Sequence, residues 1–255
     1  MKHIKKKYAF ESKELPNELA DKTIKVTNPK LTDLNNSKIT VPFIQTDDGT
    51  FVKTFKFSKN SNEHIIIPIP DLTLVYFDSA YNLNKLRIEQ EEELYKKLKV
   101  NEVKLGEQSI NEIYRYYGYA TSCVISLFTT LESFMNQMIP DNSIYQKPLK
   151  HRTEIYTKEQ IQKAIQFEDK IKDVLPQLLD ITFQLKSPAY THIQNLKKLR
   201  DDIVHTKSDQ NLKQQEELIK RLLKFNFEET FNSVAKFINH YKPDYVIQCD
   251  CGVDF

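Results

Sequence analysis

The chain has 255 residues, with 37 Lys and Arg against 35 Asp and Glu, which gives a formal net charge of +2 at pH 7. This balance excludes a protein that binds nucleic acid through its overall charge, so any such site must be local. Hydrophobic residues make up 40% of the chain and only 4 residues are glycine, a composition that argues against disorder and favours helices.

The cysteines and the hydropathy of the chain indicate its cellular compartment. The basic N-terminal cluster is not followed by the apolar core of a signal peptide. The longest uncharged stretch, residues 116–131, is shorter than the roughly 20 residues of a membrane span. Cys249, Cys251 and His240 lack the spacing of familiar zinc sites, and the odd number of cysteines is typical of reduced thiols. We therefore expect a cytoplasmic protein that contacts no membrane and needs no metal or cofactor.

Residues 1–80 are predicted to form an N-terminal arm and a small β segment. Within them, residues 40–57 alternate apolar and polar side chains on either side of Asp48-Gly49. This pattern predicts a β-hairpin, because glycine tolerates the positive φ of a tight turn. Residues 64–77 are predicted to be a further extended segment, which two prolines restrict to a sheet edge.

Residues 81–245 have a helical pattern, and residues 246–255 are expected to be a C-terminal tail. A charged helix is predicted over residues 83–98. The longest helical pattern covers residues 108–139, where one apolar stripe runs to a proline stop signal at Pro140. This helix is the expected core of the fold.

The second half of the chain is predicted to add further helices. A polar loop over residues 141–156 leads to a capping box, Thr157-Lys158-Glu159-Gln160, at the start of the next helix. That helix is expected to be interrupted at Pro176, and a single final helix is expected over residues 212–241. Helices joined by short connections predict a mainly α fold, an antiparallel bundle beside the small N-terminal β-hairpin.

One predicted helix carries a candidate site. Ser187-Pro188 has the residue types of an N-cap and a first helical position, and the stretch Asn195–Lys207 follows in the same helix. Arg200 and His205 lie five residues apart in it, on or beside the buried edge that its recurring apolar residues predict. A guanidinium and an imidazole beside an apolar face make a candidate site.

This helix resembles the signature of the HEPN superfamily, the helical domains of prokaryotic toxins, abortive-infection proteins and CRISPR-associated ribonucleases. The signature is an arginine, four to six residues and a histidine, often with a polar residue directly after the arginine. Arg200, Asp201 and His205 match it. Some toxins of the family carry a tyrosine two residues after the histidine, where this chain has Lys207.

Residues 119–139 are similar to the long second helix of many HEPN domains. Glu132 and Asn136 occupy its familiar polar positions, one helical turn apart, from which they can reach a neighbouring helix. The resemblance covers about residues 107–241 and leaves the β segment outside. It implies an HEPN-like helical bundle in which Glu132, Asn136 and Asp201 support the site.

The resemblance implies a metal-independent endoribonuclease, acting as a toxin or antiphage effector. RNA carries its own nucleophile, the 2′-hydroxyl, so cleavage requires proton transfer and a cation beside the charged phosphorane. His205 is expected to be the general base or acid and Arg200 the phosphate clamp. The products should end in a 2′,3′-cyclic phosphate.

The spacing of the pair raises a geometric problem. Five residues on an ideal helix correspond to about 500°, which leaves the two side chains some 140° apart. Either the helix is distorted before His205, or the site combines two motifs, as family members do across a two-fold dimer. We therefore expect a homodimer with RNA as substrate, and an antitoxin or another regulatory protein is a further expected partner.

Two alternatives stand beside the ribonuclease. In the structural interpretation, Arg200 pairs with Glu132 or Asp201, and His205 ends its helix by interacting with the last carbonyls. In the functional alternative, the chain is a non-catalytic HEPN-like module that binds RNA, a nucleotide or a partner protein.

Three further residues are candidate RNA contacts. Tyr190 and Lys207 have the residue types that stack on bases and attract phosphates. His192 lies two turns before Arg200 and is either a second functional imidazole or a surface residue.

Overall fold

The computed structural model describes residues 3–14, 43–60, 64–99, 107–205 and 212–250. The chain divides into two compact units, one of residues 6–75 and the other of residues 1–5 and 76–255. The sequence places this boundary after residue 80, and the structure places it after Val75. The protein is mainly helical, with a few small strands.

The smaller unit is an antiparallel sheet. It consists of β1 (Glu11–Ser12), β2 (Phe43–Gln45), β3 (Phe51–Ser58) and β4 (His64–Pro68). The first half of β3 lies between β1 and β2, with Val52 opposite both Glu11 and Ile44, and its second half pairs with β4. The hairpin predicted around Asp48-Gly49 is confirmed, and Gly49 has a φ of 81°, which suits a residue without Cβ.

The expected extended segment over residues 64–77 is wrong in its second half. Helix α3 (Leu72–Lys97) begins inside it. The carboxylate of Asp71 accepts hydrogen bonds from the backbone N–H groups of Thr73 and Leu74, at 2.9 and 3.2 Å. This N-cap satisfies donors that have no partner within a helix, and it starts α3 eleven residues before residue 83.

The larger unit is built of helices and one hairpin. After α3 come α4 (Glu107–Met138), strands β5 (Ile144–Pro148) and β6 (Thr153–Thr157), α5 (Lys158–Ala164), α6 (Phe167–Asp169), the π-helix η1 (Lys170–Val174) and α7 (Leu175–Leu179). The last three helices are α8 (Pro188–Val204), α9 (Leu212–Leu223) and α10 (Phe227–Tyr241). The capping box at Thr157 and the N-cap at Ser187 are confirmed.

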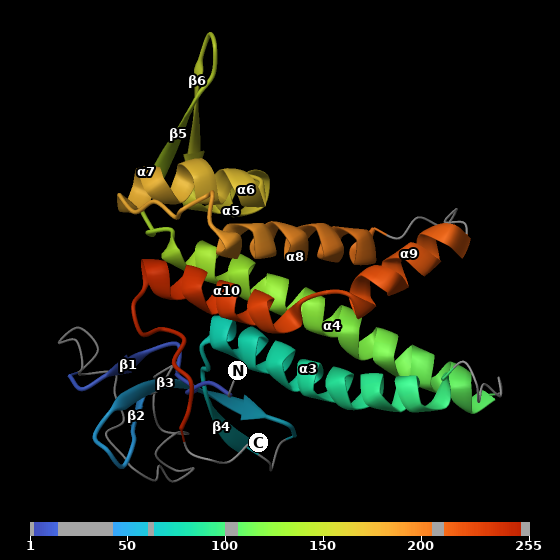
Figure 1. Ribbon diagram of the computed structural model, residues 1–255. Helices are drawn as coiled ribbons and strands as arrows, with labels where there is room; N and C mark the ends of the chain where they lie inside the picture. The colour runs from blue at the N-terminus through green and yellow to red at the C-terminus, as the bar shows by residue number, and fades with distance from the viewer. Residues whose placement is uncertain (1–2, 15–42, 61–63, 100–106, 206–211, 251–255) are drawn as a thin grey trace. The chain divides into compact units, whose positions relative to one another are not determined.

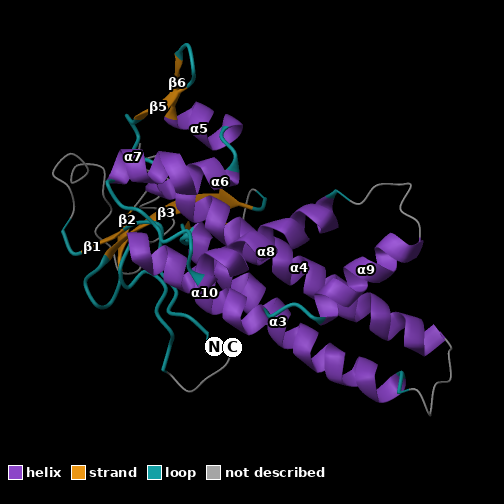
Figure 2. Cartoon of the chain, turned by 45° about the horizontal axis from the view of Figure 1, so that its top comes forward, coloured by secondary structure: helices purple, strands orange, loops and turns teal. Residues whose placement is uncertain are grey.

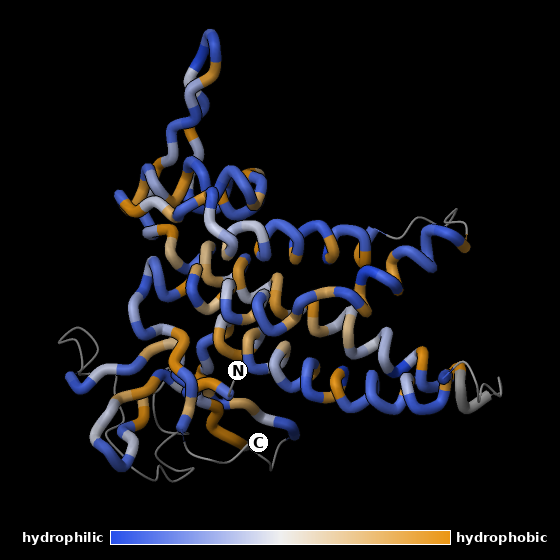
Figure 3. The backbone as a smooth tube through the Cα atoms, viewed as in Figure 1, coloured by the Kyte–Doolittle hydropathy of each residue, from blue (hydrophilic) through white to orange (hydrophobic). Residues whose placement is uncertain are grey.

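Four long helices form an antiparallel bundle in this unit (Figure 1). Helices α3 and α8 run in one direction, and α4 and α10 run in the opposite direction. Apolar residues recur along α4, whereas the second half of α3 is mostly hydrophilic (Figure 3). The core contains Leu127, Phe128, Leu131, Phe134 and Met135 of α4, Leu196 of α8 and Phe231, Val234 and Phe237 of α10. The apolar stripe read from the sequence is therefore the buried face of α4.

The polar loop expected over residues 141–156 is wrong. Most of it forms the antiparallel hairpin β5–β6, in which Tyr145 lies opposite Tyr156. The hairpin projects beyond α5 and α7 (Figures 1 and 2). Its turn contains no glycine, and its alternation of apolar and polar residues is weak, so neither usual hairpin signal marks it.

The helices on either side of α8 also differ from expectation. The helix that begins at Lys158 was expected to break at Pro176, but it first breaks at Ile165-Gln166. Pro176 lies inside the first turn of α7, where its missing N–H is tolerated. The helix expected over residues 212–241 is two helices, because Asn226 caps α10 by accepting a hydrogen bond from the backbone N–H of Glu229 at 3.2 Å.

The ends of the described chain pair with each other. Ile4 forms a β-bridge with Gln248, and the N–H of Cys249 donates to the carbonyl of His3 at 2.8 Å. The described part of the expected C-terminal tail is thus held by backbone hydrogen bonds. None of the helices in the described ranges is both long enough and apolar enough to cross a bilayer.

Burial of one face of α8 should stabilise the helical unit. Leu196 is 0% exposed in the middle of α8. Leu196→Ala is expected to lower the free energy of unfolding by about 2–5 kcal/mol, because it removes buried carbon and leaves a cavity. Gln194→Ala, at an exposed position of the same helix, should change it by less than about 0.5 kcal/mol. Urea unfolding measures both, and equal effects would contradict the orientation of α8.

Candidate functional site

Helix α8 presents the predicted site in its last turns. Its first turn is fixed by the Ser187 hydroxyl, which accepts a hydrogen bond from the N–H of Tyr190 at 3.3 Å. Ile193, Leu196 and Leu199 are buried along one face and set the rotation of the helix about its axis. Arg200 follows Leu199 by about 100°, so it lies at the edge of the buried face.

The Arg200 side chain contacts α4. Its guanidinium lies 2.9 Å from the carboxylate of Asp201 and 3.6 Å from that of Glu132. Its Cζ also lies 4.8 Å from the centroid of the Phe128 ring, a distance typical of a cation–π contact. The side chain is 28% exposed. With five N–H donors, it retains capacity for an anionic ligand at its open side.

Asp201, one of the two carboxylates that contact Arg200, also contacts Lys197. Burial raises the pKa of Asp201, but hydrogen bonds from Lys197 and Arg200 outweigh this effect and leave the pKa below its ordinary value. Lys197 Nζ lies 2.8 Å from the Asp201 carboxylate. Asp201 is therefore ionised at neutral pH and holds both cations in place.

Glu132 and Asn136 each reach a neighbouring helix. Glu132 contacts Arg200 of α8, and the side-chain oxygen of Asn136 accepts a hydrogen bond from Lys170 Nζ at 3.1 Å. Lys170 is only 6% exposed and also donates to the carbonyl of Gln162 at 3.1 Å. Burial lowers the pKa of this lysine, against the opposing effect of the Glu132 charge. The two supporting residues thus link α8 to the π-helix through α4.

His205 lies just beyond the helix. Its N–H donates to the carbonyl of Asp201 at 2.9 Å, and its φ of −102° and ψ of 35° leave the helical region. The side chain is exposed, and its ring has no hydrogen bond within the described ranges. Because α8 remains helical through Val204, distortion before His205 does not bring the pair together. Arg200 and His205 of one chain therefore diverge around the helix.

The remaining predicted site residues have different environments. Tyr190 is 3% exposed, so burial prevents the base stacking expected of it. His192 is half-buried, with Nδ1 2.8 Å from the hydroxyl of Ser233 on α10. Lys207 lies outside the described residues, as does Cys251, and the described residues contain no cluster of ligands suited to a metal.

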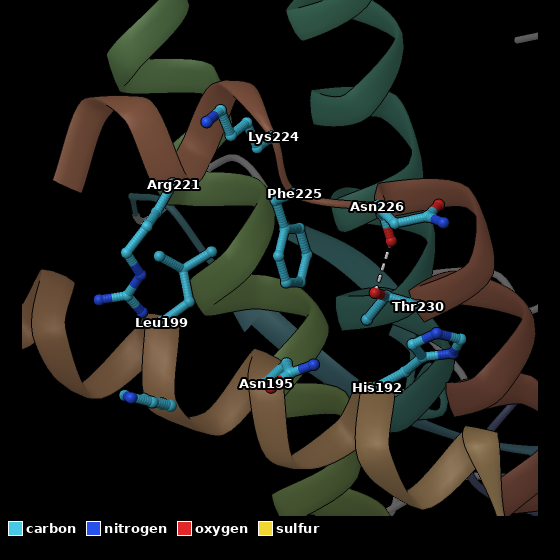
Figure 4. Close-up of a pocket in the computed structure, with 9 residues that line it drawn as sticks. His192, Asn195, Leu199, Arg221, Lys224, Phe225, Asn226 and Thr230 are labelled. Carbon is cyan, nitrogen blue, oxygen red and sulfur yellow. Dashed lines mark hydrogen bonds between the residues drawn. The ribbon is translucent and has the colours of Figure 1, made fainter. Parts of the chain in front are cut away.

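A second feature of α8 was missed by sequence reasoning. A pocket lies between α8 and the connection from α9 to α10 (Figure 4), and Arg200 is not among the residues that line it. It is lined by His192, Asn195, Lys198, Leu199, Arg221, Lys224, Phe225, Asn226 and Thr230. The signal that could have found it is Asn226 followed by Phe-Glu-Glu, an N-cap with an acidic first turn.

Comparison with known proteins gives no match. No family model matches the chain, and neither a curated protein nor a solved structure matches it. The helical fold and the geometry of the site are therefore the grounds for any functional proposal.

The buried lysine gives a prediction about pH. In an unfolded chain the pKa of Lys170 is about 10.4, and burial lowers it in the folded protein. As the pH rises, the folded state releases this proton first, the unfolded state then binds more protons, and stability increases. The free energy of unfolding of the wild type, minus that of Lys170→Met, should therefore rise as the pH approaches about 10.4 from below.

Urea unfolding at several pH values measures this difference. Lys172→Met is the matched control, because Lys172 is an exposed residue of the same π-helix. The difference in the free energy of unfolding between the wild type and Lys172→Met should stay constant with pH. The same constancy for Lys170→Met would contradict the role of burial.

Proposed function

We propose that the protein is a metal-independent endoribonuclease that uses Arg200 and His205. The observation that supports this most is the state of the two side chains: a guanidinium held by Glu132 and Asp201 with one side open, and an exposed imidazole at the end of the same helix. A held guanidinium is ordered before substrate binds, and an exposed imidazole is accessible to accept or donate a proton.

In this mechanism His205 accepts the proton of the RNA 2′-hydroxyl, which attacks the adjacent phosphorus. Arg200 binds the phosphate oxygens and stabilises the negative charge that grows in the phosphorane. The 5′-oxygen leaves with a proton from an imidazolium, and the product ends in a 2′,3′-cyclic phosphate. Proton transfer and charge stabilisation account for every step of this reaction.

Cleavage requires an arginine and a histidine near one phosphate. Within one chain the pair diverges by about 140°, because five residues of helix separate the two side chains. We therefore propose a homodimer in which each chain contributes Arg200 and His205 to a composite cleft. The resemblance of the motif to HEPN ribonucleases supports the same arrangement and also a role as a toxin or antiphage effector, with an antitoxin or other protein as regulator.

A non-catalytic module that binds RNA, a nucleotide or a partner protein is the second candidate. This candidate is favoured by the contacts of Arg200 with the carboxylates of Glu132 and Asp201. An arginine whose charge is already balanced is typical of a structural ion pair. The two candidates differ in whether RNA is cleaved.

The test of the activity is RNA cleavage in the presence of EDTA. His205→Ala is expected to reduce the rate by about 10²–10⁴-fold through loss of proton transfer. Arg200→Ala is expected to reduce it by about 10²–10³-fold through loss of charge stabilisation. Arg200→Lys keeps the charge but loses the planar fork, and should also be impaired.

Arg115→Ala and His151→Ala are the matched controls, since both residues are exposed and lie outside α8. They should cleave at the wild-type rate, and circular dichroism verifies the folding of every variant. Intact RNA with the wild type, or cleavage that survives both substitutions in α8, would contradict the proposal and favour the binding module.

The composite cleft predicts the oligomeric state. Light scattering at micromolar concentration should give twice the mass of the chain, and activity per chain should fall on dilution as dimers dissociate. A protein that is monomeric at the concentration at which it cleaves RNA would contradict the composite cleft while leaving the activity itself intact.

A further inference from the structure

The pocket beside α8 is formed where the predicted final helix breaks. Three residues, Lys224, Phe225 and Asn226, join α9 to α10 and cross above α8, so side chains of three elements converge there. The volume of the pocket is about 440 Å³, within the range of small-molecule sites. In Figure 4 the Phe225 ring descends into the space, between Arg221 on one side and His192 and Thr230 on the other.

Three of the nine lining residues carry a positive charge. Lys198, Arg221 and Lys224 line the pocket, and no carboxylate of the described residues does. Arg221 pairs with Asp202 through one nitrogen, whereas neither Lys198 nor Lys224 has an ion pair with any residue in the described ranges. The pocket therefore carries excess positive charge, which an anionic ligand of matching geometry would neutralise.

The other lining residues suit a flat, polar group attached to that anion. Phe225 is half-buried, and its ring contacts Phe227 edge to face at 4.9 Å. In Figure 4 the side chain of Asn195 lies below the ring and offers an amide donor and acceptor, whereas the amide oxygen of Asn226 caps α10. His192 is held by Ser233 through Nδ1, which leaves its other ring nitrogen without a partner in the described structure. An aromatic ring beside an amide is a combination that binds nucleobases.

We propose that this pocket binds a nucleotide unit, with its phosphate on Lys198, Arg221 and Lys224 and its base against Phe225. The unit comes either from a free nucleotide or from one residue of single-stranded RNA. Arg200 does not line the pocket, because it is directed to Phe128 and Glu132 of α4. The site is therefore separate from the proposed cleavage centre and does not depend on cleavage.

Binding is measured by isothermal titration calorimetry on the full chain at low salt. The probes are adenosine and uridine 5′-monophosphates, the two nucleosides, inorganic phosphate, and a 2′-O-methyl uridine hexanucleotide, which lacks the 2′-hydroxyl needed for cleavage. A nucleotide site should bind a monophosphate or the hexanucleotide more tightly than inorganic phosphate or a nucleoside. Preference for the monophosphates identifies a free nucleotide, and binding of the hexanucleotide alone identifies RNA.

Two sets of variants locate the binding. Lys198→Ala combined with Lys224→Ala should weaken it by about tenfold or more, through loss of charge-assisted hydrogen bonds. Phe225→Leu keeps an apolar side chain but removes the ring, and should weaken it by about fivefold or more. Lys213→Ala combined with Lys236→Ala makes the same change in net charge at exposed positions outside the pocket, and should leave the affinity unchanged.

Three results would overturn the proposal: no probe binds, inorganic phosphate binds as tightly as the nucleotides, or the control pair weakens binding as much as the pocket pair. The outcome is independent of the cleavage assay. If the protein binds nucleotide here but leaves RNA intact, this site is supported and the ribonuclease proposal is contradicted. If it cleaves RNA but binds no nucleotide here, the ribonuclease proposal is supported and this site is contradicted.

Discussion

The packing of α8 against α4 and α10 is the interaction on which both candidate sites depend. Burial of Ile193, Leu196 and Leu199 fixes the rotation of α8 about its axis. Once this rotation is fixed, Arg200 must meet α4, and Lys198 must turn toward the α9–α10 connection, because successive helical residues point about 100° apart. Arg200, which contacts carboxylates, and Lys198, which has no ion pair with a described residue, therefore lie on opposite sides of the buried face of α8.

Charge balance differs between the two sides of α8. On the α4 side, Glu132 and Asp201 neutralise Arg200, and Asn136 supplies a neutral acceptor to the buried ammonium of Lys170. A buried charge is costly without hydrogen bonds, so this side behaves as an organised network. On the pocket side the positive charges of the described residues exceed the negative ones, which leaves an attraction available to a ligand. The proposed cleavage centre and the proposed nucleotide site thus differ in how far their positive charges are already balanced.

The break between α9 and α10 has a local cause with a distant effect. Asn226 caps α10, and its carbonyl accepts a hydrogen bond from the Thr230 hydroxyl at 2.6 Å. The chain therefore crosses above α8 instead of continuing as one rod, and it carries Phe225 to a point where α8 faces it.

The sequence by itself determined the elements whose signals are local. The Gly49 turn, the Thr157 capping box, the Ser187 N-cap and the apolar stripe of α4 were predicted, because each depends on residues within a few positions of one another. It also indicated Arg200, His205, Glu132 and Asn136 as candidate residues. The start of α3 and the break at Asn226 have local signals, the caps Asp71 and Asn226, which the prediction did not use, and the β5–β6 hairpin lacks both usual hairpin signals. Only the tertiary structure decided the pocket. It also decided that Tyr190 is buried. These features depend on which distant segments meet, and no spacing within one segment encodes that.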